Sequence, residues 1–330
     1  RIGGVLKANA YGLGLNKIAR KLLSLGCRDF FLTSLEESLA VRDESKNSNI
    51  ILLNGIINLN ENEIKKMLNF RIIPVINSLL ELKKFYKNYN ESNEETIALH
   101  FDTGINRLGV TEREANEVIN FCKKKKTKIF CIMSHLASAD EPRNIMNKKQ
   151  INKFEEIIQN FKESQHSLAN SNGIINLKQI EFNIVRSGGC LFGTIENNHF
   201  KNIIELYARV LQIKDIECFH EIYGYNGTYQ TRGKKRIAII GFGYADGYPR
   251  ILSNISYVFL KKRLPVIGSI SMDYMTVDIS KLKDKDIKVG DYVELIGKNI
   301  KLSEIAKKSH TIPYEILNNI GNRVKKIYID

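Results

Sequence analysis

Short apolar runs alternate with longer amphipathic segments along the first two-thirds of the chain. A short continuous apolar run is typical of a buried strand, and apolar residues three or four positions apart indicate one face of a helix. The runs predict strands at 4–7, 30–33, 50–53, 72–76, 97–101, 129–133, 167–169 and 182–185. The amphipathic segments predict helices at 16–25, 35–41, 61–68, 79–89, 112–124 and 151–161. Strands and helices that alternate in this way indicate parallel strands joined by helical crossovers.

About eight such strand–helix units favour an α/β fold of the closed (β/α)8, TIM-type barrel kind. A doubly wound open sheet is the alternative, but that fold would carry a G-x-G-x-x-G phosphate loop after its first strand. Residues 8–14 contain glycines without that spacing. We therefore expect the barrel.

The pattern changes after residue 204. Runs with alternating apolar positions are separated by Gly, Asn and Asp, and they predict strands without helices between them until a helix at 303–307. These runs lie at 209–213, 237–240, 257–259, 276–279 and 292–296. We therefore expect a barrel domain over 1–204 and a mainly β domain over 205–330. Because the sequence starts at Arg1 and not at Met, we also expect a preceding N-terminal segment.

Composition narrows the class of protein. Hydrophobic residues make up 43% and charged residues 26%, which excludes a wholly disordered chain. No apolar run approaches the length of about 20 residues that crosses a bilayer. The net charge is +14, but the basic run 123–126 falls at an expected helix end, where cations complement the helix dipole. We therefore expect no nucleic-acid or membrane partner, although a positive field can attract an anionic cofactor or substrate.

Five cysteines are an odd number, and none forms a C-x-x-C pair. This usage indicates free thiols in a reducing compartment, so we expect a cytoplasmic protein without a signal peptide or a metal site. The five are Cys27, Cys122, Cys131, Cys190 and Cys218.

Polar residues follow the expected strands of the barrel at the end where barrel active sites lie. Lys7 ends the first strand, Arg107 follows the fifth, His135 the sixth, Ser171 the seventh, and 186–189 the eighth. A lysine that follows apolar residues directly is desolvated, which lowers its pKa and suits it to act as a base or to form a Schiff base. By position alone, a surface lysine remains the alternative.

The run Lys7-Ala8-Asn9-Ala10-Tyr11-Gly12 resembles the pyridoxal-phosphate lysine motif of the alanine racemase family. Further segments resemble the motifs of that family in the same order. They are the D-T-G-x-x-R-x-G segment at 102–109, the segments at 134–140, 170–171 and 186–188, the Y-x-x-T-Y segment at 225–229, and the segments at 243–250 and 271–273. Matches in this number and order identify the chain as a member of the family.

The resemblance implies pyridoxal 5'-phosphate as cofactor and two bases on opposite faces of the substrate. Lys7 would hold the cofactor and take the proton from the D-enantiomer, and Tyr225 would take it from the L-enantiomer. The implied cofactor ligands are Tyr11, His135, Ser171, Arg186, Gly188 and Gly189. Arg186 would face the pyridine nitrogen, and because a guanidinium only donates hydrogen bonds, the ring would stay a weaker electron sink.

The resemblance also assigns the substrate contacts. Arg107 and the backbone of Met272 would bind the carboxylate, for which arginine offers a charge-assisted fork. Tyr244 would narrow the entry channel. The family further implies a head-to-tail homodimer, in which the tyrosine and the methionine of one second domain complete the site of the partner's barrel.

Two positions depart from the family pattern. Many members carry a carbamylated lysine two residues before the motif aspartate, where this chain has His100. A histidine could orient Arg107 only through a hydrogen bond. Leu13 stands where the family has a histidine.

The residues and the resemblance together predict an isomerase that interconverts L- and D-alanine and supplies D-alanine for peptidoglycan. The alternatives are a pyridoxal-phosphate-dependent decarboxylase of the same architecture and a racemase of another amino acid, such as serine. A non-catalytic cofactor-binding barrel would lack the second domain. A basic nucleic-acid-binding protein is the alternative from another class.

Overall fold

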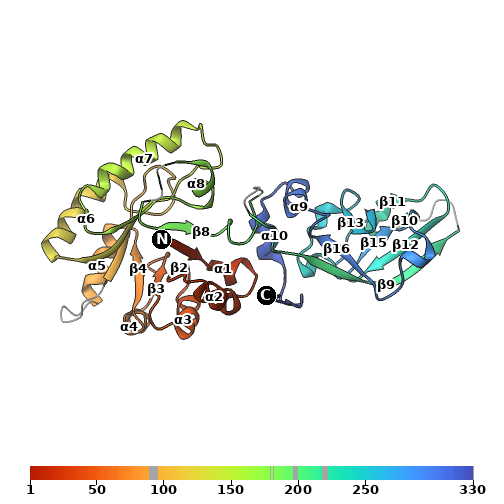
Figure 1. Cartoon of the computed structure of the whole chain (residues 1–330), viewed down its shortest axis with the longest axis horizontal. Helices are drawn as coiled ribbons and strands as arrows, with labels where there is room; N and C mark the ends of the chain where they lie inside the picture. Colours follow the sequence, from red (N-terminus) through yellow and green to blue (C-terminus); the bar gives the residue numbers. More distant parts are fainter. Residues whose placement is uncertain (89–95, 179, 181, 196–199, 218–221, 330) are drawn as a thin grey trace. The chain divides into compact units, whose positions relative to one another are not determined.

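The computed structural model describes residues 1–88, 96–178, 180, 182–195, 200–217 and 222–329. The chain divides into two compact units, Arg1–Leu191 and Phe192–Asp330 (Figure 1). Each unit has its own buried apolar core.

The strands of the first unit form a parallel sheet in the order β7-β6-β5-β4-β3-β2-β1-β8. Two backbone N–H groups, of Asn183 and Ile184, donate to the His166 carbonyl at 3.1 Å, and the Arg186 N–H donates to the Ala169 carbonyl at 2.9 Å. These bonds join the β8 side to the β7 side, so the sheet nearly closes and the expected (β/α)8 fold is confirmed. The strands are β1 (Ile2–Val5), β2 (Asp29–Leu32), β3 (Asn49–Leu52), β4 (Ile72–Ile76), β5 (Thr96–His100), β6 (Lys128–Met133), β7 (Gln165–Ser167) and β8 (Val185–Ser187).

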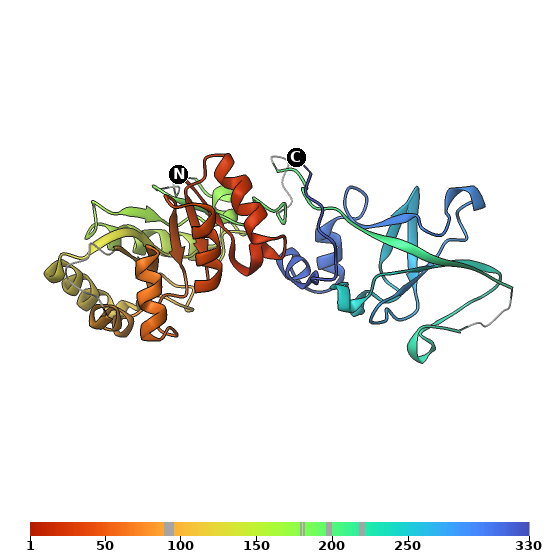
Figure 2. The same cartoon turned by 90° about the horizontal axis from the view of Figure 1, so that it is seen from below.

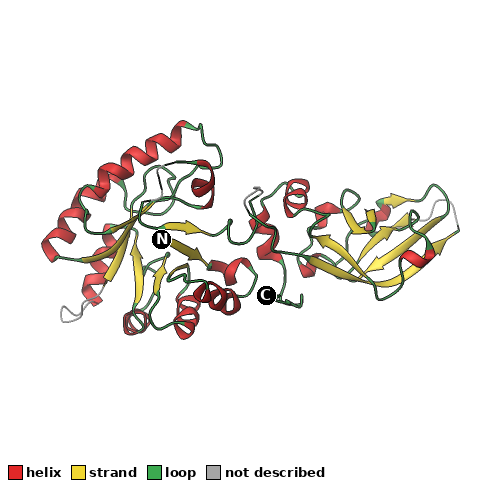
Figure 3. Cartoon of the chain, viewed as in Figure 1, coloured by secondary structure: helices red, strands yellow, loops and turns green. Residues whose placement is uncertain are grey.

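Helices lie on the outside of these strands (Figure 3). Two of them begin with a capping box, in which a glutamate three residues after the N-cap bonds back to the N-cap backbone. The longer helices are α2 (Leu15–Ser24), α3 (Leu35–Glu44), α4 (Glu61–Asn69), α5 (Leu79–Asn88), α6 (Glu112–Lys125) and α7 (Ile145–Ile158), and the short ones are α1 (Lys7–Tyr11) and α8 (Ser171–Asn176).

Element ends differ from the expected ones where the backbone turns sharply. β1 ends at Val5 and not at Lys7, because the next residues form the left-handed turn described below. β8 starts at Val185, three residues late, after Phe182 with φ 42°. Arg186 therefore lies within the strand and not after it. α7 starts at Ile145, where Asn144 accepts a hydrogen bond from the Met146 N–H as N-cap.

The second unit is a closed antiparallel barrel in the order β12-β15-β14-β13-β16-β9, which confirms a mainly β C-terminal domain (Figure 2). Its first strand alternates buried and exposed residues from Leu206 to Leu211, as a strand with one face on a core does. The strands are β9 (Leu206–Ile216), β12 (Lys235–Ile240), β13 (Tyr257–Leu260), β14 (Lys262–Ile267), β15 (Met275–Asp278) and β16 (Tyr292–Ile296). A hairpin of β10 (Ile222–Tyr223) and β11 (Tyr229–Gln230) and the helices α9 (Leu302–Lys308) and α10 (Pro313–Asn319) complete it.

None of the helices in the described part of the chain combines the length and the apolarity needed to cross a membrane.

Candidate active site

The candidate residues of the first unit gather at the carboxyl ends of its parallel strands. Lys7 follows β1, His100 ends β5, and His135 lies two residues beyond β6. Ser171 opens α8 after β7, and Arg186 lies in β8. This is the end of a (β/α)8 barrel at which active sites are built.

A left-handed turn carries Lys7. The four residues after it have φ angles between 53° and 56°, although none of them is glycine: Ala8, Asn9, Ala10 and Tyr11. A left-handed helical conformation costs an L-residue about 1–2 kcal/mol, so such a turn persists only where its surroundings hold it. Strain of this kind is concentrated at functional sites.

Hydrogen bonds from several directions hold the turn. The Ala10 N–H donates to the Leu6 carbonyl and the Gly12 N–H to the Ala8 carbonyl, both at 2.8 Å. Asn9 contributes twice, because its side-chain Oδ1 accepts from the Leu15 N–H at 2.8 Å and its carbonyl accepts from the Gly14 N–H at 3.0 Å. The turn is therefore tied to the start of α2.

The loop after β8 lies close to the phenol of Tyr11. A Cβ added at Gly188 would stand 2.5 Å from the Tyr11 hydroxyl, so any larger residue there would force the loop or the phenol to move. The buried Ser171 hydroxyl accepts hydrogen bonds from the N–H groups of Gly188, at 3.0 Å, and Cys190, at 3.3 Å. These two bonds use both lone pairs of the Ser171 hydroxyl oxygen, so the hydroxyl proton can be donated to another acceptor. Phenol and hydroxyl together suit the oxygens of a phosphate ester.

Arg186 is a buried cation fixed by oxygen acceptors. Its Nη1 donates to the carbonyl of Ser167 at 2.8 Å and to the hydroxyl of the same residue at 2.6 Å. Its Nη2 donates to the Ser134 carbonyl and lies 3.5 Å from Nδ1 of His135. No carboxylate of a described residue pairs with it. Burial lowers the pKa of Arg186 to about 10, which still leaves the group protonated near neutrality.

Both imidazoles of the site are held neutral. Burial, assisted by Arg186, lowers the pKa of His100 to about 4, and the same two causes lower that of His135 well below its usual value. The His100 Nδ1 lies 2.9 Å from Oδ1 of Asn77, whose amide nitrogen faces the carbonyl of Val75 at 3.0 Å. The Asn77 oxygen must therefore accept, which places the proton on Nδ1 and leaves Nε2 of His100 as an acceptor. That Nε2 is buried and has no partner among the described residues.

The expected effect on Lys7 is confirmed. Burial is the largest cause that lowers its pKa, and the positive charge of Arg107 is the second, while Glu37 opposes both. The rim thus combines an amine that gives up its proton readily with two arginines and two neutral imidazoles. A net positive rim with hydroxyl donors on one side and a reactive amine on the other fits pyridoxal phosphate, an anionic phosphate ester that bears an aldehyde.

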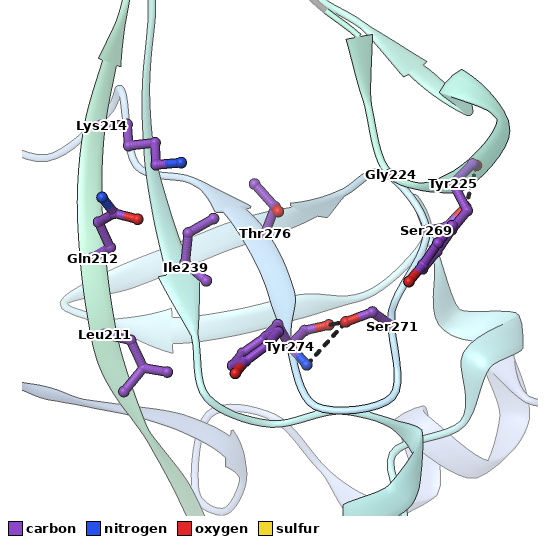
Figure 4. Close-up of a pocket in the computed structure, with 10 residues that line it drawn as sticks. All are labelled: Leu211, Gln212, Lys214, Gly224, Tyr225, Ile239, Ser269, Ser271, Tyr274 and Thr276. Atoms are coloured by element: carbon purple, nitrogen blue, oxygen red, sulfur yellow. Dashed lines mark hydrogen bonds between the residues drawn. The ribbon is translucent and has the colours of Figure 1, made fainter.

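Tyr225 belongs to the second unit. It lies at the tip of the β10–β11 hairpin, in a 3-10 turn, and its backbone carbonyl accepts a hydrogen bond from the Ser269 hydroxyl at 3.1 Å. A Cβ at Gly224 would stand 2.2 Å from the Ser269 nitrogen, so the hairpin packs tightly on that loop. The phenol borders a pocket of about 800 Å³ (Figure 4). Its lining comprises Leu211, Gln212, Lys214, Gly224, Tyr225, Ile239, Ser269, Ser271, Tyr274 and Thr276.

Met272 and Tyr244 lie next to each other in the second unit. The Tyr244 N–H donates to the Ser271 carbonyl at 3.1 Å, and the Ala245 N–H donates to the Met272 carbonyl at 3.0 Å. Both side chains are exposed, Met272 by 52% and Tyr244 by 43%. The candidate site residues therefore fall into two groups, one in each unit.

Sequence reasoning missed three polar residues that support the site. Asn77 sets the tautomer of His100, and Glu81 accepts from the Asn77 backbone N–H at 2.7 Å. Glu37 accepts from the Asn9 backbone N–H at 2.8 Å. The signal available for Glu37 was the S-x-x-E pattern of Ser34–Glu37, but that pattern predicts a local capping box and not a contact with the Lys7 turn.

Comparisons with known proteins point to one family. The family model for the N-terminal domain of alanine racemase matches residues 1–196, and the model for the C-terminal domain matches 203–328. The chain is 38% identical to alanine racemase of Rickettsia bellii, over 99% of this chain and 81% of that protein. It is 35% identical to that of Brucella abortus, over 100% of this chain and 87% of that protein.

Solved structures agree with the sequence comparisons. The structure of alanine racemase from Bartonella henselae with covalently bound pyridoxal phosphate has a TM-score of 0.92 and 36% identity, and the match covers 100% of this chain and 92% of that one. Biosynthetic alanine racemase from Pseudomonas aeruginosa has a TM-score of 0.91 and 27% identity, with the same two coverages.

Proposed function

The chain belongs to the alanine racemase family, and from this premise we propose that Lys7 and Tyr225 are the two bases with which it interconverts L- and D-alanine. The enzyme is an isomerase that depends on pyridoxal phosphate. When bound, this cofactor withdraws electrons from the amino acid and so acidifies its Cα–H bond. The protein's own side chains position the reactants and move the proton.

One observation carries the assignment of Lys7. Its amine stands at the carboxyl-end rim of the barrel, on a strained turn, with its pKa lowered by burial and by Arg107. An amine of lowered pKa is a nucleophile toward an aldehyde and a base near neutral pH, which are the two tasks the reaction asks of it.

The cofactor ligands divide between the two sides of the rim. Tyr11 and Ser171, with the loop of Gly188 and Gly189, would hold the phosphate group. Arg186 would donate to the pyridine nitrogen, and the neutral His135 lies beside that guanidinium. Because Arg186 has no acidic partner among the described residues and stays protonated, it would offer that nitrogen a hydrogen bond without taking a proton from it.

Substrate recognition and proton transfer use both units. Arg107 binds the substrate carboxylate from the barrel, the backbone of Met272 assists, and Tyr244 narrows the entrance. Nζ of Lys7 takes the Cα proton from D-alanine, and Oη of Tyr225 takes it from L-alanine. In each direction the other base returns a proton to the opposite face, so configuration is inverted.

A homodimer unites the two groups of residues in this proposal. Tyr225 is 66% exposed, and Met272 and Tyr244, which neighbour each other, are also exposed in the second unit. Exposed aromatic and thioether side chains are enriched at surfaces that bind a partner. The second unit of one copy supplies Tyr225 and Met272 to the barrel of the other.

Hybrid dimers test this arrangement. When Lys7→Ala and Tyr225→Phe chains are co-expressed, a shared site predicts about a quarter of the wild-type activity, because half the dimers are hybrids and each has one intact site. A site completed within one chain predicts no recovery, which would contradict the proposed dimer.

The cellular setting follows from the family and from the thiols. Cys27, Cys122, Cys131 and Cys190 are all free, which suits the reducing cytoplasm that we propose as its location. Cys218 lies outside the described residues. D-Alanine made there supplies peptidoglycan synthesis, the general role of the family.

Borohydride reduction of the holoenzyme tests the site assignment. Reduction fixes the cofactor to the lysine that holds it, and peptide mass mapping then locates the adduct. We expect the pyridoxyl group on Lys7, and an adduct on another lysine would overturn the assignment.

A further inference from the structure

The glutamate at the third position of α3 makes an unusual contact. In α4 and α6, the glutamates at this position bond back to the N-cap backbone: Glu63 to Asn60 at 2.8 Å and Glu114 to Thr111 at 3.2 Å. In α3, the Ser34 hydroxyl accepts from the Glu37 N–H at 3.2 Å, but the return bond is not among the contacts of the described residues. The Glu37 carboxylate is directed elsewhere.

Its Oε1 accepts from the Asn9 backbone N–H at 2.8 Å. Asn9 lies in the left-handed turn, 28 residues earlier in the chain. The bonds within the turn use the N–H groups of Ala10 and Gly12. The N–H of Asn9, the residue before Ala10, donates to Glu37 instead. The carboxylate thus anchors the middle of a strained turn that starts at Lys7.

The other carboxylate oxygen, Oε2 of Glu37, is buried and has no hydrogen-bond partner among the described residues. A charge left without a local partner acts on its surroundings at longer range. Here the surroundings include Lys7, whose pKa Glu37 raises against the effects of burial and Arg107.

We propose that Glu37 is a positioning residue for the racemase reaction: its carboxylate holds the turn that carries Lys7 and places one negative charge near the lysine amine. It touches neither substrate nor cofactor in this scheme. It acts through the Asn9 backbone, which fixes where Lys7 and Tyr11 stand, and through its field, which sets how readily the amine protonates. The inference rests on the proposed role of Lys7.

Two substitutions separate these effects. Glu37→Gln keeps an oxygen that accepts from the Asn9 N–H but removes the charge, whereas Glu37→Ala removes both. Glu36 is the exposed neighbour of Glu37 in the first turn of α3. Glu36→Gln and Glu36→Ala are therefore matched controls, because they change the net charge and the charge at the start of the helix by the same amount.

The first measurement is the titration of Lys7 in the full-length protein without cofactor. Competitive acetylation over a pH series, read by peptide mass spectrometry, gives the midpoint for that amine. We expect both Glu37 variants to lower the midpoint by about half a pH unit or more, since a nearby charge is lost. The Glu36 variants should match the wild type. A Glu37→Gln curve that overlays the wild-type curve would overturn the charge effect.

The second measurement is hydrogen exchange of the peptide over residues 7–15. Glu37→Ala should speed exchange at Asn9 by about tenfold, the equivalent of one lost hydrogen bond, and Glu37→Gln should restore protection. In the holoenzyme, the Lys7 amine is free to titrate only when substrate is bound, so the acid limb of kcat for D-alanine should move to lower pH in Glu37→Gln. Unchanged exchange in Glu37→Ala would overturn the anchoring role.

Borohydride mapping of the wild type keeps the two proposals distinct. If the adduct lies on Lys7 and the Glu37 variants behave as wild type, the role of Glu37 is wrong and the racemase assignment stands. If the adduct lies elsewhere, the assignment of Lys7 itself is wrong.

Discussion

Replacing Gly188 with alanine tests how closely the loop after β8 and the Lys7 turn fit together. The added Cβ would lie 2.5 Å from Oη of Tyr11, 3.2 Å from its Cζ and 3.4 Å from Cβ of Val5. The first of these distances is impossible for real atoms, so either the loop or the phenol must move. Tyr11 is only 8% exposed and its backbone is fixed in the strained turn, so the phenol cannot swing away freely.

Two magnitudes follow. Overpacking of this kind destabilises a fold by about 1–3 kcal/mol. Displacement of the phenol would also remove the hydrogen bond that we propose between Tyr11 and the phosphate. Such a bond to a charged group is worth about 1.5–3 kcal/mol, which corresponds to a 10- to 150-fold weaker affinity for pyridoxal phosphate. We therefore expect Gly188→Ala to lower the unfolding temperature and to raise the Kd for the cofactor by at least about tenfold.

Cofactor titration followed by absorbance, together with thermal unfolding, measures both effects. Tyr11→Phe provides the internal control, because it removes the oxygen that clashes. In the Gly188→Ala/Tyr11→Phe double variant, the destabilisation caused by alanine should shrink, while affinity should stay at the level of Tyr11→Phe alone. If Gly188→Ala binds the cofactor as the wild type does, Tyr11 and the loop do not form one phosphate site.

Three further changes have defined directions. His100→Gln should make the cofactor-free protein less sensitive to acid. The pKa of His100 is about 4 in the folded state and 6.5 in the unfolded state, so the wild type loses about 3 kcal/mol of stability as pH falls from 6.5 to 4. Urea unfolding at pH 7 and pH 5 measures the loss, and an equal loss in the wild type and the variant would contradict this reasoning. Arg107→Leu should raise the pH midpoint of Lys7 in competitive acetylation, because it removes a cation that lowers the pKa of the amine. This is the opposite of the shift expected for Glu37→Gln, and a lower midpoint in Arg107→Leu would contradict the effect assigned to Arg107. The Arg42 guanidinium donates to five backbone carbonyls, which a lysine ammonium cannot reach together. Arg42→Lys should therefore lower the free energy of unfolding, measured in urea, by about 2 kcal/mol or more, and a change below about 0.5 kcal/mol would show these bonds to be unimportant.

The barrel could be predicted because its signal is repeated along the chain. Strands β2 to β5 are buried along nearly all of their length and are short apolar runs, and most of the helices have an apolar face. β7 (Gln165–Ser167) is polar, and its apolar signal comes from the residues that follow it. In the second unit β14 was not predicted, because Lys262 and Arg263 open it and Pro265 interrupts its apolar residues. Proline counts against a strand in sequence reasoning, yet here it pairs with Tyr257. α10 was also missed, although Pro313 at its first turn is a recognised start signal.

The candidate site could be read only in part. The motif around Lys7 identifies the lysine. The left-handed conformation of Ala8–Tyr11 could not be predicted from residue preferences, because alanine and tyrosine rarely adopt it. Tertiary contacts impose the turn. The roles of Asn77 and Glu37 depend on which oxygen or nitrogen faces which partner, and such an orientation is fixed by packing between distant segments.

Isotope exchange in Tyr225→Phe tests the two-base assignment most directly. In heavy water, Lys7 should still exchange the Cα proton of D-alanine, whereas exchange from L-alanine needs the missing phenol. We expect Tyr225→Phe to slow deuterium incorporation into L-alanine far more than into D-alanine, while Tyr257→Phe, the same change on β13, leaves both rates as they are. Equal slowing of the two enantiomers by Tyr225→Phe would contradict the assignment of Lys7 and Tyr225 as separate bases.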